Sequence, residues 1–550
     1  MIVFKRINVR PGSFVRSSAI SGFEEGQGSS CLKCFMNSCR WKSTNQRQHK
    51  SKWQSVIGLE VHAQINAKSK LFSDAEIDFM ARPNTRVSLF DAAIPGTLPV
   101  LNKRCVEAGV RAALAFSSSI NPVSLFDRKH YFYSDLPAGY QITQQRLPLA
   151  QGGHLEFEVF TQGIHDKPYM KSCQLTQLQL EQDSGRSLHE EEKSRTLIDL
   201  NRAGIPLIEF VFAPDLNDGE EAVAMVRELC RILEVLEVCT GKMEEGALRV
   251  DANVSVRQMG SSELGVRSEV KNIGGIRSVG NAIHFEVKRH ISVLESGGTI
   301  ANETRFWDPQ SNKTYPMRDK EVDQDYRFMP EPNLPPLRVD LSGNLSDPDI
   351  VNVPNIEAGL PELPRETRLR LKEHFKLPGP VVTALISDSK LLRYFLDITS
   401  EDLNRNPKTV ANVGTIELNY VLNKANIKSE DCNLESTTLG EIVDLLQSGT
   451  INLLTVKKIL FELIVNSSSK TPTQLVEDNQ WQQITEPEKI AEICRKEIAG
   501  SEDLVASYKV PKKKEVSFNK MMNNIAESSG GRVNMKLAVT ILRELLDGNK

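Results

Sequence analysis

Hydrophobic and polar positions alternate along residues 56–64, which read VIGLEVHAQ. Alternate side chains of a β-strand share a face, so Glu60 and His62 point one way and Leu59 and Val61 point the other. A carboxylate and an imidazole that lie side by side on a rigid strand are suited to a metal or phosphate site. The pattern therefore predicts a strand with one buried face and one chemically active face.

The same alternation recurs later in the chain. Residues 177–183 and residues 248–257 alternate with period two, and the second stretch is the clearest predicted strand. Helical periodicity intervenes at residues 220–236 and 279–294. Strands with one apolar and one polar face, separated by helices, are typical of an α+β domain built on an antiparallel sheet. We predict such a domain over residues 53–349.

The character of the chain changes after a proline-rich segment at residues 329–336. Few strand signals follow it. Short helices are predicted at residues 365–375, 381–386, 390–396, 439–446 and 455–466. We predict a helical domain over residues 350–485.

The last part of the chain, residues 486–550, predicts a small helical tail domain. Asn534 is a suitable N-cap for a helix over residues 535–546, where leucine and isoleucine recur every four residues. A basic cluster precedes this helix and consists of Lys509, Lys512, Lys513 and Lys514.

The first 52 residues differ in composition from the rest. They contain ten Lys or Arg, two acidic residues and many Ser, as in a mitochondrial transit peptide. A basic arm that binds RNA is the alternative. The pair Cys31 and Cys34 has no second cysteine pair at ligand spacing, so we predict no zinc site there.

Charge and cysteine usage narrow the possible functions. The net charge is −3, and removal of the +8 carried by the first 52 residues leaves −11 for the remainder. So acidic a protein does not bind nucleic acid through bulk charge and needs a local basic patch. Six scattered cysteines in the remainder suit a reducing compartment. No apolar run approaches the roughly 18 residues of a membrane span.

The candidate chemistry lies in acidic residues, since the chain has no P-loop, no G-x-G-x-x-G and no G-x-S-x-G motif. Five glutamates lie in or beside strand-like stretches: Glu60, Glu181, Glu209, Glu245 and Glu269. Together with His62 they supply oxygen ligands and one nitrogen, which suit Mg²⁺ or Mn²⁺. The alternative for each glutamate alone is a solvated position on a strand.

Basic and aromatic residues accompany these acids. In the stretch DRKHYFY at residues 127–133, Lys129, Tyr131 and Tyr133 share one face, and Lys271 lies beside Glu269. A metal-binding acid cluster bordered by cations suits chemistry on ATP, because the cations neutralise charge on the transferring phosphoryl group. The alternative for Lys271 is an ordinary cross-strand ion pair.

Eight motifs together resemble one family closely. They are IGLEVH at 57–62, PGTLPVLN at 95–102, FDRK at 126–129, YFYSDLPAGYQI at 131–142, NRAGIPLIE at 201–209, MEEG at 243–246, EVKN at 269–272 and DYRFMPEP at 325–332. The set resembles the B subunits of the aspartyl/glutamyl-tRNA amidotransferases, in their mitochondrial form. The resemblance runs from about Trp53 to the C-terminus and weakens in the tail.

This resemblance implies a cradle-shaped kinase-like domain, a helical middle and a tRNA-binding tail. It also implies a two-step reaction, in which ATP phosphorylates the γ-carboxylate of glutamate on tRNA-Gln and ammonia then displaces the phosphate. The A subunit, an amidase, would supply the ammonia, and a small C subunit would hold the other two together.

We assign roles on this basis as hypotheses. The metal ligands are Glu60, His62, Glu181 and Glu209; the catalytic residues are Lys129, Glu245, Glu269 and Lys271; the ATP-binding residues are Arg128, Tyr133 and Asn253; and the tRNA-binding residues are Lys509, Lys512, Lys513 and Lys514.

Two departures from the family pattern affect these assignments. Bacterial relatives carry zinc-binding cysteines near residues 71–91, where this chain has Ser73, Ser88 and Asp91, so we expect no zinc. The family's Leu-Glu-Glu-Asp stretch carries Gln182 in place of the second acid. Two other functions stay open, namely a tRNA-binding scaffold that has lost its catalytic site and a free-standing Mg²⁺ nuclease.

Overall fold

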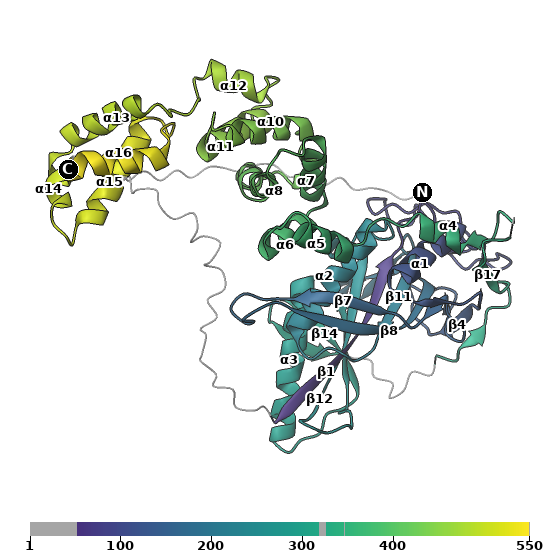
Figure 1. Ribbon diagram of the computed structural model, residues 1–550. Helices are drawn as coiled ribbons and strands as arrows, with labels where there is room; N and C mark the ends of the chain where they lie inside the picture. Colours follow the sequence, from purple (N-terminus) through teal and green to yellow (C-terminus); the bar gives the residue numbers. More distant parts are fainter. Residues whose placement is uncertain (1–51, 318–325, 346, 549–550) are drawn as a thin grey trace, which may run out of the picture. The chain divides into compact units, whose positions relative to one another are not determined.

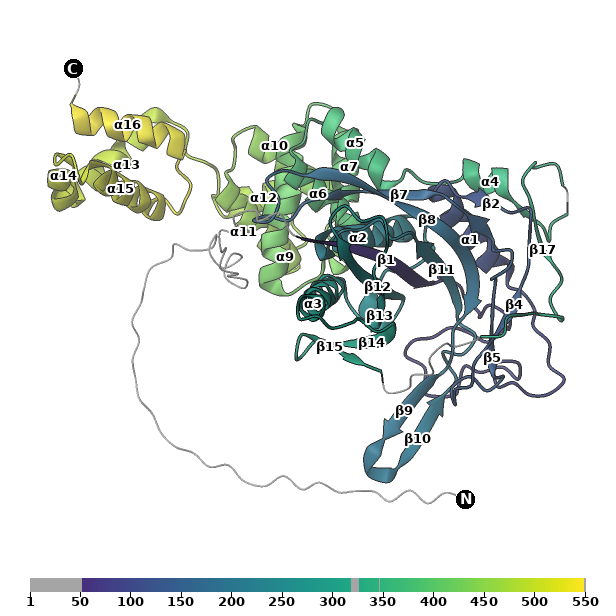
Figure 2. The ribbon, with the colours of Figure 1, turned by 90° about the horizontal axis from the view of Figure 1, so that it is seen from below.

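The computed structural model describes residues 52–317, 326–345 and 347–548. Figures 1 and 2 show its helices and strands from two sides. The predicted transit segment, with its Cys31 and Cys34, lies outside the described residues except for Lys52.

A large sheet forms the centre of the N-terminal part. Among the described residues it has ten strands in the order β15-β14-β13-β12-β1-β11-β8-β6-β2, with β7 paired to β8. Its pairings are antiparallel except for β13 with β14. The strands are β1 (Trp53–Gln64), β2 (Ser119–Ile120), β6 (Ala150–Gln151), β7 (His154–Val159), β8 (Tyr169–Gln182), β11 (Pro206–Phe212), β12 (Leu248–Gln258), β13 (Ser268–Ile273), β14 (Glu303–Asp308) and β15 (Lys313–Pro316).

The register of β1 confirms the two faces predicted from its sequence. Leu59, Val61 and Ala63 are completely buried, whereas Glu60 and His62 between them are partly exposed. β1 lies between β11 and β12 in the sheet. The predicted strands at 177–183 and 248–257 are also confirmed, as parts of β8 and β12.

Three helices complete the core of this part: α1 (Lys103–Ala115), α2 (Gly219–Val235) and α3 (Ile276–Glu295). Their apolar residues form one hydrophobic cluster with the buried faces of the strands. The start of α2 is set by Asp218, whose carboxylate accepts a hydrogen bond from the backbone N–H of Glu221. The α+β architecture predicted from the sequence is confirmed.

Smaller sheets complete the N-terminal part. β4 (Asp127–His130) lies between β5 (Tyr140–Thr143) and β16 (Met329–Pro330), and β17 (Leu337–Asp340) lies between β3 (Val123–Ser124) and β18 (Val351–Asn352). β9 (Arg186–Glu190) and β10 (Arg195–Asp199) form a separate hairpin, which projects from the large sheet in Figure 2. The sheet of β4 and β5 matters most for function, because its side chains meet those of β8.

The rest of the described chain is helical. The helices are α4 (Val353–Ala358), α5 (Pro364–Glu373), α6 (Gly379–Ile386), α7 (Ser389–Glu401), α8 (Pro407–Asn412), α9 (Asn419–Ala425), α10 (Ser436–Gln447), α11 (Leu453–Ile464), α12 (Pro472–Asp478), α13 (Pro487–Gly500), α14 (Glu502–Tyr508), α15 (Lys514–Ser528) and α16 (Met535–Asp547). Short 3-10 helices lie at Glu191–Lys193, Met243–Glu245 and Ser429–Asp431, and a π-helical turn lies at Val413–Leu418.

The predicted cap at Asn534 is confirmed, since its side chain accepts hydrogen bonds from the N–H groups of Lys536 and Leu537. Buried residues between 371 and 476 form one hydrophobic cluster and those between 490 and 542 form another. The domain boundaries at 350 and 486 stay a prediction. Within the described ranges no helix has the length and apolarity to cross a membrane.

A buried polar network supports the edge of the large sheet that carries β13 to β15. Glu286 of α3 is completely buried and lies 2.7 Å from the guanidinium of Arg289 and 3.2 Å from that of Arg305. Burial alone would raise the pKa of Glu286, but hydrogen bonds from His290, Arg289 and Thr314 outweigh it and lower the pKa to about 2. The carboxylate therefore stabilises the fold as an ion.

Replacement of Glu286 by Gln should destabilise the N-terminal part by about 3 kcal/mol at pH 7, because two guanidinium groups lose their buried counter-charge. A lowered carboxyl pKa stabilises the fold above the ordinary value of 4.5, and that stabilisation disappears as the pH falls towards 2. The difference between wild type and Glu286→Gln in urea unfolding should therefore shrink over this range. The control is Glu263→Gln, at an exposed loop position. A difference that stays constant with pH would contradict the assignment.

Candidate functional site

Three side chains on the polar face of the large sheet form a group that can hold a metal ion. His62, Glu181 and Glu209 each offer a ligand atom, and these atoms lie within 4.8 Å of one another. Nδ1 of His62 is 3.9 Å from Oε1 of Glu181, and Nε2 of His62 is 4.0 Å from Oε1 of Glu209. It is the one such group found among the described residues.

Strand register brings these three residues together from distant parts of the sequence. His62 of β1 lies directly opposite Glu209 of β11, and Glu209 lies opposite Gln179 of β8. Glu181 is two residues beyond Gln179 and therefore shares its face. Neighbouring strands are about 4.8 Å apart, so three adjacent strands can place their ligands around one ion.

The two carboxylates are held in a dry environment. Glu181 is only 2% exposed and Glu209 is also buried. Burial raises the pKa of Glu181, and the charge of Glu209 raises it further, while Lys129 and His62 oppose the shift. Burial likewise raises the pKa of Glu209, and the charge of Glu60 adds to it. Two raised carboxyl pKa values side by side indicate a group that favours an added cation.

Amide and hydroxyl side chains orient the two carboxylates. Nε2 of Gln141 donates to Oε1 of Glu181 at 2.6 Å, and Nε2 of Gln179 donates to Oε2 of Glu209 at 2.5 Å. Gln179 also donates to Oγ1 of Thr143, at 3.2 Å. The sequence assignments omitted these three residues. The period-two pattern of residues 177–183 could have identified Gln179, since it shares a face with Glu181.

A lysine from β4 completes the charged group. Burial lowers the pKa of Lys129, but the carboxylates of Glu181 and Glu209 outweigh that effect and raise it overall. The ammonium therefore stays charged beside the two acids. Nζ of Lys129 also lies 5.0 Å from the ring centre of Tyr326, which the sequence assignments did not include.

Further polar residues extend this face across β12 and β13. Glu60 accepts a hydrogen bond from Nδ2 of Asn253 at 3.0 Å. Nζ of Lys271 lies 3.2 Å from Oε1 of Glu269, so the predicted proximity of these two residues is found within a single strand rather than across strands. Burial lowers the pKa of Lys271, but the charges of Glu269 and Asp251 raise it overall.

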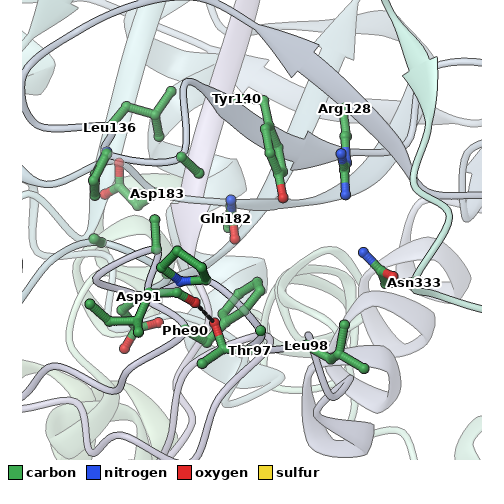
Figure 3. A pocket seen from close by; sticks show the side chains of 18 residues that line it. Phe90, Asp91, Thr97, Leu98, Arg128, Leu136, Tyr140, Gln182, Asp183 and Asn333 are labelled. Atoms are coloured by element: carbon green, nitrogen blue, oxygen red, sulfur yellow. Dashed lines mark hydrogen bonds between the residues drawn. The ribbon is translucent and has the colours of Figure 1, made fainter.

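Arg128 and Gln182 lie on the other side of the same strands, in a separate pocket. Neighbouring residues of a strand point to opposite faces, so Lys129 and Glu181 meet on one side while Arg128 and Gln182 line the other. The pocket has a volume of about 460 Å³, and Figure 3 shows Arg128 and Tyr140 side by side at one wall. Arg128 is held there by Glu331, with contacts of 2.6 and 3.0 Å.

The stretch at residues 71–91, which has Ser73, Ser88 and Asp91 at the positions expected for zinc-binding cysteines, contributes to a buried ion pair. Nζ of Lys70 lies 3.0 Å from Oδ2 of Asp91, and both side chains are buried. Oγ of Ser73 and the backbone N–H of Ser88 donate to the same carboxylate. These oxygen donors and the lysine are a poor set for zinc. The expectation of no zinc stays a prediction.

Glu245 and the tail lysines make no described contact with His62, Glu181 or Glu209. Glu245 is exposed in a 3-10 helix, and its described ion-pair partner is Lys242, at 3.4 Å. In the tail, Lys514 lies 3.2 Å from Asp547, so it already has an internal partner. The other three tail lysines, Lys509, Lys512 and Lys513, are exposed between α14 and α15.

The group of His62, Glu181 and Glu209 fits a hard divalent cation. It offers carboxylate oxygens and one imidazole nitrogen, the donor set of Mg²⁺ and Mn²⁺ sites. Oε2 of Glu181 is buried and has no hydrogen-bond partner among the described residues. A buried carboxylate oxygen without a donor is costly unless something else binds it.

Comparisons with known proteins identify the family of the chain. A family profile described as "GatB/GatE catalytic domain" matches residues 55–343, and one described as "GatB domain" matches residues 393–546. The chain is 50% identical over 497 residues to the B subunit of the mitochondrial glutamyl-tRNA(Gln) amidotransferase of Aedes aegypti. These residues are 90% of this chain and 94% of that protein.

More distant relatives give the same result. The human protein of the same name is 42% identical over 504 residues, which cover 91% of this chain and 90% of the human protein. The B subunit of an aspartyl/glutamyl-tRNA(Asn/Gln) amidotransferase of Orientia tsutsugamushi (strain Boryong) is 38% identical over 495 residues, covering 90% and 97%. The strands that carry His62, Glu181 and Glu209 lie within residues 55–343, the range matched by the profile described as "GatB/GatE catalytic domain". The chain is a member of the GatB family, which confirms the resemblance inferred from its motifs.

Replacement of Gln179 by Ala should weaken divalent-cation binding about 10- to 100-fold, because the Glu209 carboxylate loses the amide that orients it. Mn²⁺ titration followed by electron paramagnetic resonance measures the affinity. Gln182→Ala is the matched control, since Gln182 lies nearby on the same strand but faces the pocket of Arg128. If both variants lose the same Mn²⁺ affinity, the hydrogen bond from Gln179 to Glu209 is not the cause, and the prediction is wrong.

Proposed function

We propose that this protein is the transamidation subunit of a glutamine-dependent tRNA amidotransferase that converts Glu-tRNA(Gln) to Gln-tRNA(Gln). ATP and Mg²⁺ are the proposed cofactors. The observation that carries the proposal is the buried group of His62, Glu181 and Glu209 with the charged Lys129 beside it. Family membership supports the reaction, because the relatives are named as B subunits of such enzymes.

The proposed reaction has two steps. A γ-carboxylate oxygen of the glutamyl group attacks the γ-phosphorus of ATP, and ADP leaves, which gives an acyl phosphate. The nitrogen of ammonia then attacks the acyl carbon, phosphate leaves with the bonding electrons, and the nitrogen loses a proton. Mg²⁺, when bound, would neutralise charge on the phosphates of ATP.

The residues of this chain would hold the reactants and balance their charge. Glu60, His62, Glu181 and Glu209 are the proposed metal ligands, and the hydrogen bond from Asn253 orients Glu60. Lys129 and Lys271 keep their positive charge through nearby carboxylates, so they can neutralise negative charge that develops on the phosphoryl group. Water exclusion around the buried acids strengthens each of these interactions.

The proposed assembly contains two further proteins, an amidase (the A subunit) that produces ammonia and a small C subunit. This division of labour agrees with the lack of a nucleophile motif in the present chain. The proposed location is the mitochondrial matrix, supported by the basic, serine-rich start of the sequence and by the mitochondrial relatives. The other candidate function is a scaffold without catalysis, and the intact metal-binding group favours the enzyme.

The purified complex should convert glutamate to glutamine on charged tRNA-Gln only when ATP is present. Deacylation of the product tRNA followed by amino-acid analysis measures the conversion. Omission of the present chain, with both partner proteins retained, should abolish it. If the two partners convert Glu-tRNA without this chain, the chain is not the transamidation subunit.

Replacement of His62 or Glu60 by Ala should lower the rate of Gln-tRNA formation at least about 100-fold, since the phosphoryl-transfer site loses a metal ligand. Glutamine hydrolysis by the partner amidase should continue. The matched control for the histidine is His154→Ala, at an exposed position of β7. Normal Gln-tRNA formation by the His62 variant would contradict the metal assignment.

Replacement of Lys509, Lys512 and Lys513 by Ala should weaken tRNA binding. It should also reduce the slope of the logarithm of the binding constant against the logarithm of salt concentration, by about one unit for each phosphate that a lysine no longer neutralises. Lys514 is retained because of its ion pair with Asp547. Filter binding at several salt concentrations measures the slope.

A double variant of Lys489 and Lys496 is the control. Both residues are exposed on α13 of the tail, and each is already paired with a glutamate. An unchanged slope in the triple variant would place the tRNA interaction elsewhere.

A further inference from the structure

A row of aromatic rings lies next to the charged group. Of its members only Tyr133 has a role expected from the sequence, as an ATP-binding residue, and we assign it a different one below. We define this aromatic row as Tyr131, Tyr133, Tyr326 and Phe328; Phe132 lies between the first two in the sequence. The ring centres of Tyr131 and Tyr133 are 5.5 Å apart, those of Tyr131 and Tyr326 are 6.2 Å apart, and those of Tyr326 and Phe328 are 6.1 Å apart. These ring pairs connect the loop after β4 with the segment before β16.

The aromatic row is connected to the carboxylates through Gln141 and Lys129. The hydroxyl of Tyr131 donates to Oε1 of Gln141 at 3.0 Å, and Gln141 in turn donates to Glu181. Lys129, which interacts electrostatically with Glu181, also lies over the ring of Tyr326. The row is therefore an outward extension of the metal-binding site.

Two rings in the loop after β4 are open to solvent. Phe132 is 88% exposed and Tyr133 is 54% exposed, which is unusual for side chains of this size. Large open rings in the loop that follows Lys129, whose ammonium lies over the ring of Tyr326, suit a ligand that is flat and apolar in one part and anionic in another. A nucleotide has both properties, whereas an apolar protein surface would not require the cations.

The backbone holds these rings in place. The carbonyl of Tyr133 accepts a hydrogen bond from the N–H of Leu136, and the carbonyl of Leu136 accepts one from Gly139. The N–H of Tyr131 donates to the carbonyl of Gly139. Gly139 has a φ of +73°, and a Cβ at that residue would lie 3.0 Å from the ring of Phe132. A closed turn thus supports one side of the Phe132 ring.

We propose that Phe132 and Tyr133 stack against the unpaired bases at the 3′ end of the charged tRNA. This inference rests on the proposed function, in which the glutamyl group at that end must reach the buried carboxylates. Single-stranded RNA is commonly bound by stacking its bases on aromatic side chains. Tyr131 and Tyr326 then lie between the stacked bases and the reacting group.

The RNA end fits the aromatic row better than the adenine of ATP does. More than one exposed ring is available, and successive unpaired bases can use successive rings, whereas ATP has a single base. The ring of Phe132 is almost entirely open to solvent, so a macromolecular ligand can reach it. ATP is kept as an alternative outcome of the test.

The test replaces Phe132 and Tyr133 by Leu, which keeps an apolar side chain and removes the flat ring. Dissociation constants for Glu-tRNA(Gln) and for the same tRNA trimmed of its unpaired 3′ nucleotides are measured with the whole complex, without turnover. The double variant should bind Glu-tRNA about tenfold or more weakly, since stacking is worth roughly 1–3 kcal/mol per base. Its affinity for the trimmed tRNA should equal that of wild type.

Two further variants separate stacking from structural damage. Tyr133→Phe keeps the ring and should bind normally. Phe160→Leu is the matched control, since Phe160 is an exposed phenylalanine near the end of β7. The KM for ATP should not change in Phe160→Leu. An unchanged KM for ATP in the double variant would show that Tyr133 does not bind ATP, contrary to the assignment made from the sequence.

Each other outcome overturns the inference. Equal weakening for intact and trimmed tRNA would show that the rings do not touch the 3′ end. A rise in the KM for ATP alone would assign the rings to the nucleotide substrate. Because binding is measured without turnover, failure of the conversion assay in wild type would count against the proposed function and not against the stacking.

Discussion

Strand β1 lies between β11 and β12, and its register determines which side chains reach the polar face of the sheet. His62 is opposite Glu209 on one side and opposite Arg249 on the other. Side chains alternate with period two, so a slip of one residue would bury His62 and expose Val61. The completely buried apolar face of β1 opposes that slip. Burial of one face thus fixes the chemistry of the other.

The same packing buries two carboxylates whose negative charge is only partly balanced by the protein. Glu181 and Glu209 are buried together, and Lys129 is the main group that offsets their negative charge. Buried charges are unfavourable unless they are paired and hydrogen-bonded, and the amides of Gln141 and Gln179 meet part of that need. An added divalent cation would meet the rest. The protein itself therefore orients these carboxylates, as the proposed phosphoryl transfer would require.

The short strands β4 and β5 and the end of β8 separate two chemically different spaces. Lys129, Gln141 and Glu181 face the metal-binding group, while their neighbours Arg128, Tyr140 and Gln182 line the pocket shown in Figure 3. Gln182 therefore lies outside the group of His62, Glu181 and Glu209, and its neutral side chain removes no carboxylate from that group. The separation also means that a substitution on one side acts on the other mainly through the backbone that they share.

The sequence by itself determined the elements and their faces. Period-two alternation identified β1, part of β8 and β12, and helical periodicity identified α2 and α3, because such patterns depend on local backbone geometry. The motifs also identified the family. Only the tertiary structure decided which acids converge: Glu181 and Glu209 meet His62, whereas Glu245 pairs with Lys242. Pairing between strands far apart in the sequence sets those distances, and composition and spacing do not encode them. For the same reason Gln141 and Tyr326, which come from other strands and loops, became visible only in the fold.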